Sequence, residues 1–139
     1  MKWEEVLIVH VVIGKTINLR NDDGDSVVMI SFTGHVTGKY FEGSVLEGAV
    51  DTQIIGRFGD RHSLSARYLL QGTDHTGQAC EIYIENNGDI HKSPKNVLFR
   101  TSPRIITNSK ALDYLNGDVL VGEGLQTESG IDITIYRAL

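Results

Sequence analysis

Two arginines, Arg100 and Arg104, lie on either side of Pro103 in one extended segment. A guanidinium group binds a carboxylate through two parallel hydrogen bonds, so these arginines could hold an anionic small molecule. Pro103 has no amide hydrogen for a strand ladder, so it is expected at a sheet edge or a bulge. The stretch 99–116 therefore predicts a strap that crosses and closes a β-barrel, with both arginines near the barrel mouth.

Proton-transfer groups are available on other segments. Asp51 and Gln53 share one face of the extended segment 44–55, because successive side chains of a strand point to opposite faces. Side chains that point inward from different strands of a barrel can converge on one small ligand. In such a cavity Asp51 or Tyr83 would be the general acid or base.

The arginines also admit an interpretation without a ligand. Arg67 alternates with an apolar face at 64, 66, 68 and 70, and an apolar face normally points inward, which would leave Arg67 outside. Arg100 and Arg104 share a face that could be a solvated or cross-strand-paired edge. A buried arginine needs a carboxylate partner, because an unpaired buried charge costs several kcal/mol. Asp51 is the first candidate for that partner. A purely structural ion pair would meet the same need.

Alternation of apolar and polar residues predicts the elements that position these groups. Strands are expected over 6–13, 26–36, 44–55, 63–70, 79–86, 119–124 and 131–136, in addition to the segment that begins at Phe99. Turn residues separate them, including 21–25, 86–89 and 127–130. A short helix is expected near 109–115, with Asn108 or Ser109 as its N-cap. The pattern predicts an all-β, mostly antiparallel closed barrel of about eight strands and one domain over 1–139.

Composition narrows the function classes. The chain has 139 residues and a formal charge of −5, which disfavours nucleic-acid binding because phosphate recognition needs a concentrated basic surface. Cys80 is the only cysteine, so no internal disulfide can form. The five histidines show no close metal-ligand spacing, and we expect neither a metal nor a cofactor.

The N-terminal segment Val6–Ile13 is apolar on both faces, which indicates a strand covered on both sides. Its outer cover could be a second copy of the chain, which would make the protein a homodimer or a higher homo-oligomer. No run approaches the roughly 20 apolar residues of a membrane span, so no membrane partner is expected. The expected compartment is the cytoplasm.

The chain resembles domain-of-unknown-function family 3237, a family of calycin-like barrels. The matching motifs cover nearly the whole chain in order and lie at 34–38, 43–53, 66–68, 82–88, 99–104, 114–116 and 121–124. One departure is Thr52, where the family pattern has an aromatic residue. The resemblance implies a fold and not a reaction. The site candidates are chosen partly because they fall in these motifs: Asp51 and Tyr83 as catalytic residues, and Gln53, Arg67, Asn86, Arg100, Arg104 and Tyr114 as ligand-binding residues.

Three functions remain open at this point. The first is binding of a small polar or anionic metabolite in the barrel lumen. The second is a metal-independent lyase, isomerase or hydrolase that uses an Asp/Arg/Tyr cavity. The third is a structural or self-association module with a filled barrel. A roomy polar lumen favours the first two, and a filled apolar lumen favours the third.

Overall fold

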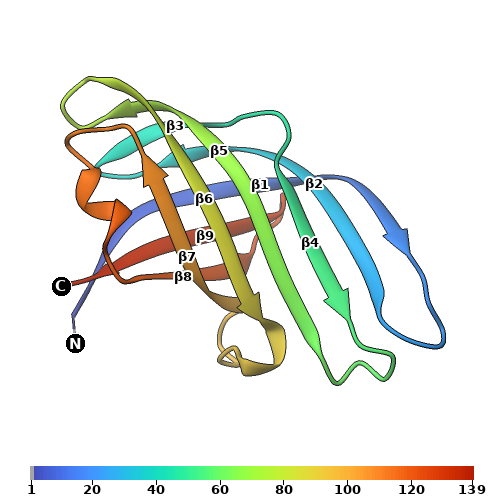
Figure 1. The fold of residues 1–139 in the computed structure, drawn as a ribbon. Coiled ribbons are helices and arrows are strands. Elements are labelled where there is room, and N and C mark those ends of the chain that lie inside the picture. Colours follow the sequence, from blue (N-terminus) through green and yellow to red (C-terminus); the bar gives the residue numbers. More distant parts are fainter. Residues whose placement is uncertain (1) are drawn as a thin grey trace.

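The computed structural model describes residues 2–139, and Met1 lies outside the described residues. In this part of the chain, nine antiparallel strands join into one closed sheet (Figure 1). The strands are β1 (Trp3–Leu19), β2 (Ser26–Thr37), β3 (Phe41–Val45), β4 (Val50–Ile55), β5 (His62–Asp74), β6 (Ala79–Asp89), β7 (Phe99–Thr107), β8 (Leu120–Gln126) and β9 (Ile131–Ala138). Their order in the sheet is β1-β9-β8-β7-β6-β5-β3-β2-β4, and the additional pairings β1–β2 and β5–β4 complete the closure.

Strands β3 and β4 together occupy a single position in the barrel. β3 pairs with the end of β2 and the end of β5, whereas β4 pairs with the beginning of both strands. The extended segment expected over 44–55 is therefore interrupted at 46–49, where Gly48 adopts a φ of 103° that favours glycine. Nine strands in eight positions confirm the expected closed antiparallel barrel of about eight strands.

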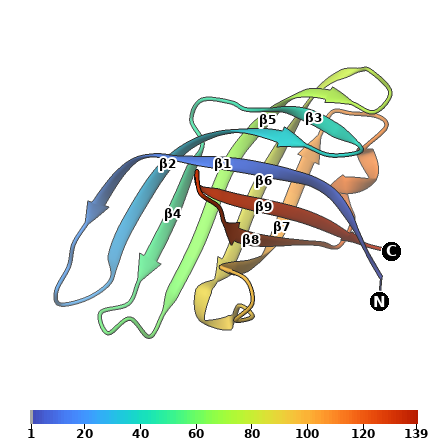
Figure 2. The same cartoon turned by 180° about the vertical axis from the view of Figure 1, so that it is seen from behind.

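Side chains alternate between a packed interior and the outer face. On β5, Leu64, Ala66, Tyr68 and Leu70 are buried and the residues between them are not. One half of the interior is filled by large apolar side chains: Leu7, Val36, Phe41, Leu70, Ile82, Leu112 and Leu115. The two termini lie next to each other, with Trp3 paired to Ala138 (Figures 1 and 2).

The segment that contains the arginines is part of the barrel wall. Residues 99–107 form β7 between β6 and β8, and only 108–116 crosses the end of the barrel (Figure 1). The ladder between β7 and β8 ends at Thr101, so Pro103 has no partner strand on that side. This local edge confirms the position expected for the proline.

The two helices of the described chain are short 3-10 turns, η1 (Ile90–Lys92) and η2 (Asp113–Asn116). The helix expected over 109–115 is thus a single short turn that begins later, at Asp113, although Ser109 makes the hydrogen bond expected of an N-cap residue. Its hydroxyl accepts a hydrogen bond from the Leu112 amide and donates one to Asp74. Within residues 2–139, no helix has the length and apolar character needed to cross a membrane.

The prediction of a turn at 86–89 is wrong, because these residues remain in β6. They pair with 63–66 of β5 on one side, and 86–88 pair with 101–103 of β7 on the other. Ladders on both sides satisfy the backbone and override the local turn preference of Asn-Asn-Gly-Asp. The chain turns only after Asp89, whose side chain accepts a hydrogen bond from the His91 amide.

Candidate functional site

The second half of the lumen carries polar side chains. Asp51 pairs with Ala66, which pairs with Asn86, and Asn86 in turn pairs with Pro103. Because directly paired residues point to the same face, Asp51 and Asn86 both face the interior with the buried Ala66. Gln53 follows on the same face, opposite Leu64. Three of the candidates derived from the sequence are therefore brought together inside the barrel.

Asn86 is the most unusual of these residues. Its side chain is 0% exposed, and neither its amide nitrogen nor its oxygen finds a hydrogen-bond partner within residues 2–139. A β-carbon placed on Gly122 would overlap Thr101 Oγ1 and lie 3.2 Å from Asn86 Oδ1. The side chains of Asn86 and Thr101 therefore extend over the same glycine. Gly122 leaves them the space that a larger residue would fill.

Three further polar atoms in the interior are also buried without a hydrogen-bond partner in the described chain. They are Thr101 Oγ1, Tyr68 Oη and Asp51 Oδ1. The Tyr68 ring packs edge-on against Phe32 at 5.2 Å between ring centroids. Burial raises the pKa of the Tyr68 hydroxyl, and the negative charge of Asp51 raises it further. The lumen thus presents donors and acceptors that the protein itself does not satisfy.

A chain of hydrogen bonds leads from Asp51 to the start of β5. Gln53 Nε2 donates to Asp51 Oδ2 at 2.8 Å, and Gln53 Oε1 lies 2.6 Å from His62 Nε2. Since an amide oxygen can only accept, His62 donates through Nε2–H. Burial raises the pKa of Asp51, whereas the hydrogen bond from Gln53 lowers it. One oxygen of Asp51 is therefore held in place, and the other is free to bind or exchange a proton.

Sequence reasoning did not select three residues of this inner group, namely His62, Tyr68 and Thr101. Tyr68 lies on the apolar face of its strand, and this pattern is typical of a core residue. Thr101 lies between the two residues Arg100 and Ser102 of the opposite face. Its place in an alternating strand was a usable signal, because neighbours of outward-facing residues point inward.

The three arginines lie on the outer face of the barrel. Arg67, Arg100 and Arg104 are exposed, and each alternates with buried neighbours along its strand. Arg67 pairs with Glu85, which pairs with Arg104, so these charges form a row across three strands. The arginines are therefore not at the barrel mouth, and their role in ligand binding stays a prediction.

Two other candidates also lie outside the inner group. The Tyr83 hydroxyl donates to Glu85 at 2.9 Å on the outer face, and partial desolvation and this hydrogen bond raise the pKa of Tyr83. The Tyr114 ring lies on η2, with the guanidinium of Arg137 4.3 Å from its centroid. Neither side chain joins Asp51 and Asn86.

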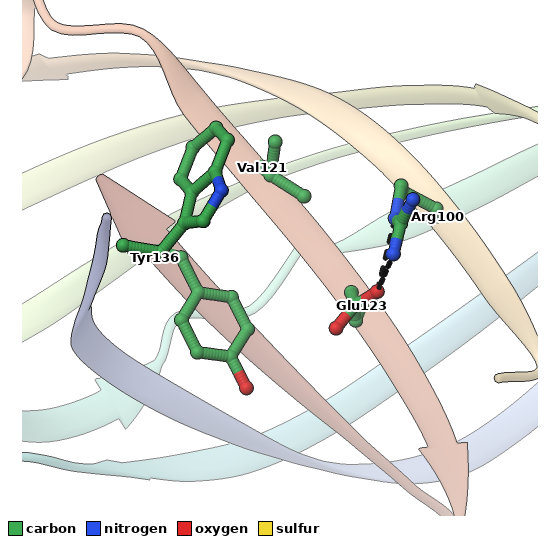
Figure 3. Close-up of a pocket in the computed structure, with 5 residues that line it drawn as sticks. Arg100, Val121, Glu123 and Tyr136 are labelled. Atoms are coloured by element: carbon green, nitrogen blue, oxygen red, sulfur yellow. Dashed lines mark hydrogen bonds and ion pairs between the residues drawn. The ribbon is translucent and has the colours of Figure 1, made fainter. Parts of the chain in front are cut away.

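Arg100 lines a shallow pocket of about 240 Å³ on the outer wall (Figure 3). The other residues that line it are Trp3, Val121, Glu123 and Tyr136. Arg100 donates from Nη2 at 2.6 Å and from Nε at 2.9 Å, both to Glu123 Oε2. Because Arg100 already has this carboxylate partner, the pocket offers no free cation for an anionic ligand.

The charged groups of the described chain limit the chemistry of the interior. The buried polar or charged residues of 2–139 are Asp74, Asn86, Thr101 and Ser109, so no lysine or arginine among them is buried. Across the same residues, no three histidine, cysteine, aspartate or glutamate side chains gather in a group that could hold a metal ion. The inner group can therefore offer hydrogen bonds and one carboxylate to a ligand.

Comparisons with known proteins agree with this fold. A family model described as "Protein of unknown function (DUF3237)" matches residues 1–138. A UPF0311 protein from Clostridium acetobutylicum is 32% identical over an alignment of 153 positions, which covers 99% of this chain and 94% of the relative.

Solved structures extend the comparison. The crystal structure of a protein with unknown function from the same organism has a TM-score of 0.81 and 28% identity, and covers 99% of this chain and 96% of that one. An enzyme from Penicillium herquei has a TM-score of 0.76 and 16% identity, with 98% and 92% covered. The second similarity concerns the fold alone.

Proposed function

We propose that this chain, which belongs to the DUF3237 family of proteins of unknown function, binds a small uncharged molecule in the polar half of its barrel lumen. One observation carries the proposal: Asn86 is fully buried, and its amide finds no partner within residues 2–139. An unsatisfied buried polar group costs about 1–3 kcal/mol. A ligand that supplies both a donor and an acceptor would remove this cost.

The expected ligand is neutral and rich in hydrogen-bonding groups. Asp51 is the acidic member of the inner group, and none of the buried residues in 2–139 is a lysine or arginine. An anion would meet this carboxylate in a low-dielectric interior without a compensating cation. A carbonyl, amide or hydroxyl would instead pair with Asn86 and Thr101. The charge pattern thus favours a polar ligand over the anionic one considered from the sequence.

The second candidate is an enzyme that transfers a proton through Asp51. Gln53 holds Asp51 Oδ2, and Oδ1 is buried without a partner in the described chain. Burial raises the pKa of this carboxylate, which makes it a stronger base than a solvated aspartate. A metal-independent isomerase or lyase step fits this arrangement, with Asp51 taking a proton from a ligand bound to Asn86.

Protein-detected ¹H–¹⁵N NMR with added acetamide or acetate tests the binding proposal, because the two probes have similar size and differ in charge. We expect acetamide to shift the backbone resonances of Asn86 and Thr101, and acetate to have no effect at the same concentration. Asn86→Leu should weaken acetamide binding by about tenfold, the worth of one or two hydrogen bonds. Arg100→Ala, on the outer wall, should leave it unchanged. Acetate binding that depends on Arg100 would contradict the proposal.

Turnover separates the two candidates once a ligand is known. Asp51→Asn keeps the size of the side chain and one acceptor oxygen but removes the base. For an enzyme, we expect this variant to bind the ligand and to lose conversion. For a binding protein, the wild type itself should release the ligand unchanged.

A further inference from the structure

We propose that Asp132, His10 and Thr37 form an acyl-transfer triad on the outer face of the barrel, with Thr37 as the nucleophile. These residues come from the adjacent strands β9, β1 and β2. His10 pairs directly with Asp132 on one side and with His35 on the other, and Thr37 lies two residues after His35 on the same face. This site is separate from the lumen, because the inward-facing neighbours of His10 are the buried Val9 and Val11.

The hydrogen bonds follow the order that acyl transfer requires. His10 Nδ1 lies 2.9 Å from Asp132 Oδ1, and His10 Nε2 lies 2.8 Å from Thr37 Oγ1. The carboxylate accepts the Nδ1 proton and thereby fixes the imidazole tautomer. The lone pair of Nε2 then faces the Thr37 hydroxyl. His10 is therefore placed as a general base, and Asp132 is a positioning residue.

Two features distinguish this cluster from a hydrogen-bond network that only joins strands. Thr37 is exposed, so a substrate can reach its hydroxyl. A pocket of about 230 Å³ lies beside the ring, lined by His10, His35, Asp132, Thr127 and Ser129 together with Val11 and Val12. The His35 ring stacks on His10 at 4.5 Å between centroids and restricts its orientation. Thr37 does not line this pocket, but the His10 ring borders it and also contacts the Thr37 hydroxyl, so an ester bound against this ring lies close to the nucleophile.

The proposed reaction is ester hydrolysis in two steps. Thr37 Oγ attacks the carbonyl carbon while its proton passes to His10 Nε2, and a new C–O bond forms. The bond to the leaving alcohol then breaks, and His10 returns the proton to that alcohol. Water hydrolyses the acyl-threonine by the same route and releases the acid. No oxidant, reductant or other reactant is consumed apart from the ester and water.

The substrate class follows from the surroundings of Thr37. Asp132 disfavours an anionic substrate, and the small pocket accepts a short acyl chain or a small alcohol. Neutral esters of short acids are therefore expected. The probe for this class is p-nitrophenyl acetate, whose leaving group is detected by absorbance.

Intact-mass and peptide mass spectrometry of the wild-type protein after brief exposure to p-nitrophenyl acetate test the proposal directly. We expect one acetyl group per chain on Thr37, together with a burst of p-nitrophenol. Thr37→Val should abolish both the burst and the acetylation at this position, because the nucleophilic hydroxyl is gone, and Thr37→Ser should retain them. Thr33→Val is the matched control, because Thr33 is exposed on the same face of β2. This control should react like the wild type.

The positioning role of Asp132 is tested by the tautomer of His10, which a contact that only stabilises the fold would not determine. In ¹⁵N NMR spectra, wild-type His10 should carry its proton on Nδ1. Asp132→Asn should lose this tautomer preference and lower the burst rate by about tenfold or more. Acetylation spread over lysines with Thr37 unmodified, or equal burst rates in the wild type and Thr37→Val, would overturn the proposal.

Discussion

Replacement of Asn86 by leucine should stabilise the free protein and at the same time weaken ligand binding. Leucine has nearly the shape of asparagine and carries no polar atoms. Asn86 is 0% exposed, and both polar atoms of its amide lack a partner within residues 2–139. The substitution therefore removes a desolvation penalty that the free protein bears and the bound protein does not.

The magnitude follows from two opposing effects. Removal of an unsatisfied buried polar group gains about 1–3 kcal/mol. The methyl groups of the leucine are larger than the amide atoms and pack against Thr101 and Gly122, which opposes this gain. Near-isosteric changes of this kind usually cost less than about 1.5 kcal/mol. The net expectation is a gain of about 1–2 kcal/mol. For 139 residues the unfolding entropy is about 0.29 kcal/mol/K, so the midpoint temperature should rise by about 3–7 °C.

Urea unfolding followed by circular dichroism measures this difference without added ligand. Asn87→Leu is the matched control, because Asn87 is adjacent in β6, is exposed, and accepts a hydrogen bond from Ser65 Oγ at 2.6 Å. The control should change the free energy of unfolding by no more than about 0.5–1 kcal/mol, in the destabilising direction. If Asn86→Leu loses more than about 1 kcal/mol while the control is neutral, the Asn86 amide is satisfied in the free protein and the reasoning is refuted.

Two further predictions concern stability. Hydrogen bonds from Thr76 and Ser109 lower the pKa of Asp74 from 3.8 to about 2. The ionised carboxylate therefore contributes fully to the free energy of unfolding above about pH 4, and this contribution is lost as the pH falls through 2. Urea midpoints should show this loss in the wild type, and Asp74→Asn should flatten it; equal slopes for both proteins would contradict the assignment. Gly122→Ala should destabilise the fold by about 1–3 kcal/mol through overlap with a threonine hydroxyl, whereas Gly117→Ala, with no atom within 4 Å of the new methyl group, should change the unfolding free energy little.

The strand pattern could be predicted from the sequence because burial in a barrel alternates with every residue. The segment 63–70 and the last strand show this alternation clearly, and the structure has strands at both places. The same rule placed Asp51 and Gln53 on one face. The turn preference of the residues was misleading at 86–89, where Asn-Asn-Gly-Asp is typical of a turn but two neighbouring ladders keep the chain extended.

Only part of the candidate site could be predicted in this way. Asp51, Gln53 and Asn86 meet in the lumen, as expected of inward-facing residues from different strands. Arg100 was selected for its chemistry, but its position between the buried Phe99 and Thr101 directs it outward to Glu123. Charge alone does not say which face of a strand a residue occupies.

By itself, the sequence determined the class of fold, the alternation of the strands and the presence of Pro103 at a local edge, because these depend on neighbours along the chain. The tertiary structure decided which residues meet across strands. The register between β4, β5 and β6 brings Asp51 and Asn86 to the same level of the barrel, and the register of β9, β1 and β2 joins Asp132, His10 and Thr37. A shift of two residues in either register would keep each side chain on its face but move it to another level of the barrel, and no local pattern in the chain fixes that level.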